Sequence, residues 1–291
     1  MSDVRSGAAV EPEADPGILD PDVPGPARRR GRSRAILVVA AWRVAIVVAF
    51  LAVWEVTSGW LMEPFWISTP SRVGQRLWEL TISGALWEHT RTTAEEAGLG
   101  LLLGMVVGVL AGLVLAYFKR VAEILDPFIL GLYSLPRVAL APLFLIWFGI
   151  GLPSKVLLAF SIVVFVAMIN TYEGAKNVDQ DLIDLIKTMQ GSQTDIARRV
   201  LLPSLMPWIM ATLRISVGLA LVGAVVGEMM GSSSGLGYYV ARSGGLFDTT
   251  GVMAGLVGLG LLAVVMNEGV RALDRWLFKW RPNVSTQGQA T

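Results

Sequence analysis

The residues of this chain offer little for covalent, redox or metal chemistry. No cysteine occurs among the 291 residues, which excludes disulfides, cysteine-ligated zinc and thiol nucleophiles. The single histidine, His89, excludes a multi-histidine metal site. Because His89 lies in a segment that is predicted below to be outside, it also argues against a Ser-His-Asp arrangement. The segment GIGLPSKV contains glycine and lysine but lacks the Gly-Lys-Ser/Thr of a phosphate-binding loop. We therefore expect a protein that is not an enzyme, with no catalytic residue, no metal and no bound cofactor.

Three ionisable residues lie inside otherwise apolar stretches: Glu55, Arg137 and Glu228. A charged side chain that faces lipid costs a few kcal/mol, so such residues usually face a protein interior or a transport path. They are our candidates for a translocation path. Arg137, in SLPRVALAP, has a structural alternative, which is pairing with Glu55 or with a backbone carbonyl. Glu228 precedes a Ser- and Gly-rich segment, which is also compatible with a place at the membrane interface.

A polar segment of both charge signs, DLIKTMQGSQTDIARRVLLP, runs from Asp184 to Pro203. Its acidic residues come early and Arg198 comes late, which suits the macrodipoles of two short helices flanking a Gln-Gly-Ser turn. Apolar residues form a stripe that begins just before this segment and continues into its first half: Leu182, Ile183, Leu185, Ile186 and Met189. This stripe is too short to form a hydrophobic core of its own, so we predict that it binds in a groove of a partner protein. The alternative is an amphipathic hairpin that rests on the membrane. Pro203 and Pro207 predict a helix break behind it.

A second pattern is a ridge of glycines at every fourth position: Gly100, Gly104, Gly108 and Gly112. Small residues in this register let two helix backbones approach closely, which is how helices associate in lipid. The ridge therefore predicts a helix-packing surface. It serves either static packing within one subunit or a helix contact that moves during function.

The composition places these residues in a membrane protein. Hydrophobic residues make up 54% of the chain, charged residues only 16%, and the mean hydropathy is +0.59. The net charge of +1 is uninformative, because the charges are strongly segregated along the chain, but the lack of a basic face argues against nucleic acid as a partner and leaves membrane lipid.

Helices of about twenty apolar residues are needed to cross the hydrocarbon core, and six such runs can be recognised. They cover 44–62, 97–118, two spans within 127–172, 207–230 and 251–267. The sequence thus predicts an all-α polytopic membrane protein with six transmembrane helices. After Thr69, amphipathic spacing predicts a further helix lying along the membrane surface.

Charge asymmetry sets the predicted orientation. With a cytoplasmic amino terminus, most of the 24 Lys and Arg residues fall inside, and the outside keeps Arg72, Arg76, Arg91, Lys155 and Arg242. Both termini and residues 173–203 are then cytoplasmic, whereas 63–93 and 232–248 are outside. We expect residues 1–34 to form a disordered cytoplasmic tail, 35–282 the transmembrane domain, and 283–291 a second cytoplasmic tail. The basic end of the first tail anchors the topology or contacts lipid headgroups.

Several strings resemble the permease subunits of binding-protein-dependent ABC importers, in the nitrate, aliphatic sulfonate and taurine branch. They include LDPFILGLYSLPRVALAPLFLIWFGIGLPSK and RRVLLPSLMPWIMATLRISVGLALVGAVVGEMMGSSSGLGYYV, and together they cover roughly residues 60–282. The segment within 173–203 resembles the EAA loop, a cytoplasmic coupling loop, of this family. Its counterparts here are Asp184, Leu185, Ile186, Gln190, Gly191, Ser192, Arg198 and Pro203. Asp184 stands where the family has Glu, and Gln190 stands where it usually has Gly.

This resemblance implies a multi-pass inner-membrane protein that binds no cofactor itself and uses ATP hydrolysed by a partner. The implied partners are a cytoplasmic ABC ATPase dimer on the coupling loop, a second permease copy in a homodimer or pseudo-dimer, and an extracytoplasmic substrate-binding protein. Small organic anions such as sulfonates lead as substrates, ahead of nitrate, bicarbonate-like anions and thiamine-precursor pyrimidines. The alternatives are an ion-gradient-driven secondary transporter or channel, and a non-transporting scaffold.

Overall fold

The computed structural model describes residues 26–60 and 66–277, and all regular elements in these ranges are helical. The chain divides into two compact units, Met1–Val56 and Thr57–Thr291. Helix α1 (Pro26–Trp60) includes all of the described part of the first unit. The basic end of the predicted tail is therefore helical from Pro26 onward, whereas residues 1–25 and 283–291 of the predicted tails lie outside the described residues.

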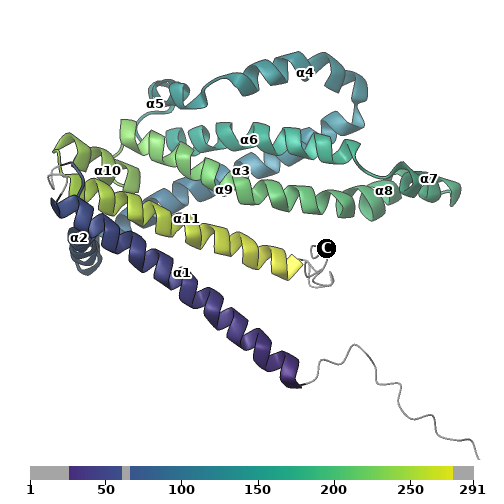
Figure 1. The fold of residues 1–291 in the computed structure, drawn as a ribbon. Helices are drawn as coiled ribbons and strands as arrows, with labels where there is room; N and C mark the ends of the chain where they lie inside the picture. Colours follow the sequence, from purple (N-terminus) through teal and green to yellow (C-terminus); the bar gives the residue numbers. More distant parts are fainter. Residues whose placement is uncertain (1–25, 61–65, 278–291) are drawn as a thin grey trace, which may run out of the picture. The chain divides into compact units, whose positions relative to one another are not determined.

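The second unit contains the remaining helices, drawn in Figure 1. They are α2 (Pro70–Ile82), α3 (Ala85–Tyr117), α4 (Lys119–Ser134), the 3-10 turn η1 (Arg137–Leu140), α5 (Ala141–Phe148), α6 (Leu152–Lys176), α7 (Gln180–Thr188), α8 (Gln193–Ile196), the π-helical turn η2 (Ala197–Leu201), α9 (Leu202–Met230), α10 (Leu236–Gly245) and α11 (Thr249–Leu277).

Within the described ranges, five helical stretches are long and apolar enough to cross a membrane: Val38–Ser58, Ala85–Tyr117, Leu152–Lys176, Gln193–Met230 and Thr249–Leu277. A sixth span is formed if α4 and the η1–α5 segment are taken as one, although they are bent by 77°. The bend follows from Pro136, which disfavours a helical conformation at the residue before it. The all-α polytopic fold is thus confirmed, with the predicted third span broken.

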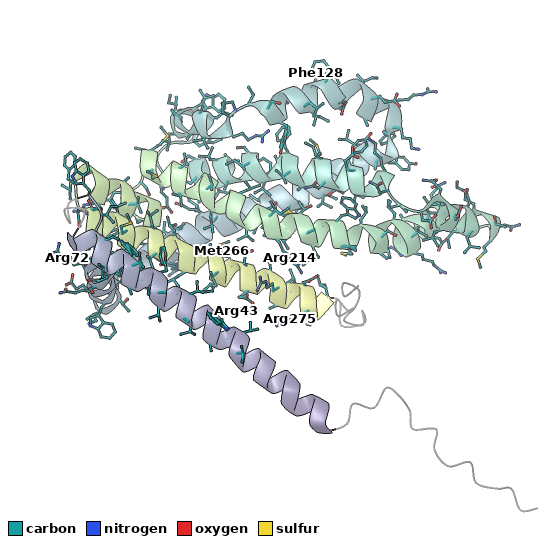
Figure 2. The ribbon with its side chains drawn as sticks, in the orientation of Figure 1. Arg43, Arg72, Phe128, Arg214, Met266 and Arg275 are labelled. Atoms are coloured by element: carbon teal, nitrogen blue, oxygen red, sulfur yellow. The ribbon has the colours of Figure 1, made fainter. Side chains whose placement is uncertain are left out.

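Helices α3, α6 and α9 form the centre of the second unit and lie side by side in Figure 1. Their shared core is built largely from small residues, among them Ala97, Ala159, Ala167, Ala220 and Ala224. Small side chains let backbones come close, so van der Waals contact replaces the hydrophobic drive that lipid cannot supply. Figure 2 marks Arg214 on α9, whose guanidinium pairs with Asp274 of α11 and ties that helix to the centre.

Helix α2 begins as predicted. The Thr69 hydroxyl accepts a hydrogen bond from the Arg72 N–H, and Pro70 occupies the first turn. Two polar contacts then fix α2 to the start of α11: Arg76 Nη1 donates to Asp248 Oδ2 at 2.7 Å, and the hydroxyls of Ser68 and Thr250 lie 2.8 Å apart.

Candidate functional site

The predicted coupling loop consists of two short helices around a turn, as the charge pattern indicated. Asp179 caps α7 by accepting the Asp181 N–H at 2.9 Å. Ser192 opens α8 with a capping box, because its hydroxyl accepts the Asp195 N–H while the Asp195 carboxylate accepts the Ser192 N–H. Asp184, which stands where the family has Glu, is exposed and pairs with Lys187 at 2.9 Å.

The turn between α7 and α8 explains the Gly-to-Gln difference. Gln190 has a φ of 57°, in the left-handed region where glycine is favoured. The glycine that the resemblance predicts at this place would adopt this backbone without strain, whereas Gln190 adopts it at a cost of roughly 1–2 kcal/mol. Gly191 is required for a different reason, since a Cβ there would lie 2.5 Å from Ile186 Cγ2.

Helix α7 presents two different faces. Leu182, Leu185 and Met189 share one face, and they are 45%, 55% and 71% exposed. Ile183 and Lys187 lie on the opposite side, toward a cavity behind the helix. The predicted apolar stripe is therefore divided. The exposed face is defined here as Leu182, Leu185 and Met189, whereas the half-buried Ile183 lines the cavity and the half-buried Ile186 packs against the turn at Gly191.

The predicted helix break at Pro203 and Pro207 is wrong. Residues Gln193–Met230 form one continuous helical stretch, with Pro203 in the first turn of α9 and Pro207 inside that helix. The π-helical turn Ala197–Leu201 accounts for the continuity at Pro203. A proline lacks an N–H and crowds the preceding helical turn, and the wider π-helical backbone accommodates both effects. The return arm of the loop, with Arg198 exposed on η2, is thus one body with a membrane-spanning helix.

A buried polar cluster at the other end of the central helices was missed from the sequence. Glu96 of α3 and Lys155 of α6 form an ion pair at 3.2 Å, with side chains only 2% and 5% exposed. Lys155 also donates to Ser232 at 2.7 Å. Lys155, which is predicted to lie on the outside, is in the first turn of α6 and its side chain is buried in the bundle.

Glu228 belongs to the same cluster. Its carboxylate accepts the Thr93 hydroxyl and the Gly237 N–H, each at 2.6 Å, and its side chain is 1% exposed. Thr93 in turn accepts the Leu236 N–H at 2.8 Å. A Cβ at Gly237 would lie 2.8 Å from the Glu228 carboxylate, so glycine is needed for this close approach. The cluster joins α3, α6 and α9 to the turn before α10.

The ion pair lies on the continuation of the glycine ridge. Gly100, Gly104, Gly108 and Gly112 face α6 at Ala159, Val163, Ala167 and Thr171, so both helices advance by four residues at each contact. One further step toward the amino termini gives Glu96 opposite Lys155. The ridge packs two helices of the same chain.

The other two candidate path residues occupy different surroundings. Arg137 is half-buried, donates to the Leu132 carbonyl at 2.8 Å, and lies 4.2 Å over the ring of Phe165. Pairing with a backbone carbonyl, one of the two structural alternatives, is thus observed. Glu55 is half-buried on α1, in the unit that precedes Thr57.

With this geometry in place, similarity to known proteins decides the family. A family model described as "Binding-protein-dependent transport system inner membrane component" matches residues 104–280, which is more than half of the chain. The chain belongs to this family. It is a multi-pass inner-membrane, non-catalytic subunit of an ABC importer, in which a partner ATPase hydrolyses ATP and a binding protein takes part.

Three relatives show how far the similarity extends. The putative aliphatic sulfonates transport permease protein of Bacillus subtilis (strain 168) is 34% identical, covering 79% of this chain and 84% of that one. The formylaminopyrimidine transport permease protein of Halalkalibacterium halodurans is 32% identical over 79% of this chain and 92% of the relative. The taurine transport system permease protein of Escherichia coli (strain K12) is 30% identical, covering 83% and 92%.

A solved structure supports the fold. A chain of the MetNI methionine ABC transporter in an inward-facing conformation superimposes with a TM-score of 0.51 at 19% identity, covering 68% of this chain and 97% of that chain. At this identity the likeness shows the shared fold alone.

Proposed function

We propose that this permease imports a small organic anion, of the aliphatic sulfonate or taurine type, or nitrate. We also propose that residues 173–203 are cytoplasmic and bind the partner ATPase through the exposed face of α7. The observation that carries the coupling proposal is this exposed apolar face on a segment that continues, through η2, into the membrane-spanning helix α9.

The coupling proposal is supported by the exposed apolar side chains of α7 and by the helical continuity from α8 to α9. Three large apolar side chains on one side of a nine-residue helix are unfavourable in water and suit a complementary groove. Because α8, η2 and α9 are continuous, a displacement of the loop is transmitted along a helix rather than absorbed in a flexible joint. ATP-driven movement of the partner would thus reach the membrane.

The substrate proposal is supported by the relatives. Two are named for transport of aliphatic sulfonates or taurine, small organic molecules that carry a negatively charged sulfonate group. A second candidate substrate class is a formylaminopyrimidine, because a relative of similar identity is named for it. We further propose that Arg137, Glu55 and Glu228 line or border the path. A guanidinium keeps its charge at physiological pH and attracts an anion.

The proposed assembly contains two permease copies, an ATPase dimer and an extracytoplasmic binding protein. The apolar surface of α4 supports a second copy, since α4 is exposed on most sides and Phe128, labelled in Figure 2, is 65% exposed. The glycine ridge is already occupied by α6 of the same chain and is not available for this contact.

The coupling proposal is tested by charging the exposed face. Leu185→Asp should abolish uptake and release the ATPase during purification, while the permease still inserts and folds. Thr194→Asp, which adds the same charge at an exposed position of α8 that does not line the cavity behind α7, is the matched control and should retain both. Wild-type uptake with normal co-purification of the ATPase in the Leu185→Asp variant would show the assignment to be wrong.

The substrate proposal is tested separately by uptake of radiolabelled taurine, an alkanesulfonate, nitrate and a formylaminopyrimidine. The complete transporter with its own binding protein is reconstituted in vesicles for this assay. ATP-dependent accumulation of a sulfonate is expected; accumulation of the pyrimidine alone would move the substrate to the second class. Arg137→Gln should lower anion uptake without releasing the ATPase.

A further inference from the structure

A cavity lies behind α7, at the end of the bundle that carries the coupling loop. It has a volume of about 580 Å³ and is half-enclosed. Its walls are the ends of two candidate membrane spans, α3 and α6, the start of α4, and the inner sides of α7, α8 and η2. The exposed face of α7 points away from it, so the cavity and the proposed ATPase surface are on opposite sides of one helix.

The cavity is basic. Lys119, Lys176 and Lys187 line it, against one carboxylate, Glu123. Lys176 pairs with Glu173, and Lys187 with Asp184, but both are i,i+3 pairs whose side chains are about half exposed. Such surface pairs contribute little, so their ammonium groups remain available to a stronger anionic ligand. For Lys119 no ion pair is formed with any residue that the structure describes.

The rest of the lining is apolar and aromatic. Leu113, Ile183, Ile196 and Leu201 supply hydrocarbon surface, and Tyr172 lies under the Lys176 ammonium at 4.4 Å. Tyrosines and lysines at the ends of spanning helices are typical of the headgroup region. A ligand that suits both the lysines and the apolar wall has a negatively charged head and a hydrocarbon tail. Free phosphate has no such tail and fits the cavity less well.

We propose that this cavity binds an anionic phospholipid of the inner leaflet, with its phosphate between Lys119 and Lys176 and its acyl chains against the apolar wall. Basic pockets between spanning helices bind such headgroups. The leaflet assignment rests on the proposed cytoplasmic position of the coupling loop, whereas binding itself does not. Because α7 forms one wall, the bound lipid supports the coupling loop from the side opposite the ATPase.

The test uses the complete transporter in nanodiscs of phosphatidylcholine, with phosphatidylglycerol added in steps. Native mass spectrometry counts retained phosphatidylglycerol, and ATPase activity is measured in parallel. Each lysine near an anionic headgroup contributes roughly fivefold in affinity. The Lys119→Gln/Lys176→Gln variant should therefore bind phosphatidylglycerol on the order of 25-fold more weakly, and the lipid should no longer stimulate its ATPase.

Arg120→Gln is the control, because Arg120 is adjacent to Lys119 and equally charged but does not line the cavity. Equal loss of phosphatidylglycerol in this control, or no loss in the double lysine variant, would overturn the proposal. Soluble glycerol phosphate that displaces the lipid at similar concentration would overturn it too, by showing a phosphate site rather than a lipid site. Loss of ATPase co-purification in the double variant would instead assign these lysines to the partner interface.

Discussion

Lys155 and Glu96 carry the most consequential interaction of individual side chains in this protein. Both are buried, and the pair is held at 3.2 Å next to the Glu228 carboxylate. Replacing a buried ion pair by apolar residues is often tolerated, whereas removing one partner leaves a buried charge without compensation. The cluster therefore makes these parts of α3, α6 and α9 sensitive to single substitutions that break a pair.

The first prediction is that Lys155→Met destabilises the permease by about 3–5 kcal/mol, the usual cost of an orphaned buried charge. Adding Glu96→Gln in the same chain should restore part of that loss, because it removes one of the two buried carboxylates that Lys155 balances, while Glu228 remains. Thermal unfolding midpoints of the purified protein measure both variants. If the double variant is no more stable than Lys155→Met alone, the ion pair is not what that lysine contributes.

The second prediction concerns acid and the contact between α2 and α11. Partial burial acts to raise the pKa of Asp248, but hydrogen bonds from the Gly251 N–H and the Arg76 guanidinium outweigh it, so its pKa is below the ordinary value. Because the folded pKa is the lower one, the contact's stabilisation is full above about pH 4 and is lost as pH falls through the folded pKa.

Asp248→Asn should thus lower the thermal midpoint near neutral pH and show less further decline between about pH 6 and pH 3 than the parent protein. Parallel declines in both proteins would indicate that other carboxylates control the acid sensitivity.

At the scale of elements, the glycine ridge fixes the distance between α3 and α6. A Cβ at Gly104 would lie 2.6 Å from Val163 Cβ, whereas one at Gly98 meets nothing within 4 Å. The third prediction is that Gly104→Ala lowers the thermal midpoint, while Gly98→Ala leaves it unchanged or raises it by removing an interior-helix glycine, worth roughly 0.5–1 kcal/mol. Similar midpoints for the two variants would contradict the close approach seen here.

The apolar periodicity of the sequence predicted the helices better than the prolines predicted where helices are interrupted. The apolar runs, the Thr69 cap and the two helices of the coupling loop were all recognisable, because each depends on local residue types. Continuity through Pro203 was not, since it depends on a π-helical turn, which has no reliable local signal. Proline alone predicts a break.

The candidate site was predicted unevenly for a related reason. Gln190 and Gly191 were located by spacing, and the structure supplies their backbone conformation and close contact. Glu96 and Lys155 are 59 positions apart in the printed sequence and meet only through helix packing, which a local pattern does not reveal. The four-residue spacing of the glycine ridge leads to this pair only once α6 is known to be the helix that packs against α3.

At the scale of the whole molecule, the two ends of the central bundle have different characters. One end holds a buried ion-pair cluster that joins three spanning helices to a loop. The other carries the coupling loop, with an apolar face exposed on one side and a basic cavity on the other. Helix α9 runs between the two ends, so a movement imposed at the coupling loop would act on the cluster at the far end.

The most direct test of coupling is site-specific cross-linking in inverted membrane vesicles that contain the complete transporter. The chain has no cysteine, so Met189→Cys and Ser233→Cys each introduce a single thiol, at the coupling loop and at the opposite end. A thiol-to-amine cross-linker should join the Met189→Cys permease to its ATPase and leave the Ser233→Cys permease unjoined. An ATPase adduct from the Ser233 variant, or none from a reactive Met189 variant, would contradict the placement of the ATPase on α7.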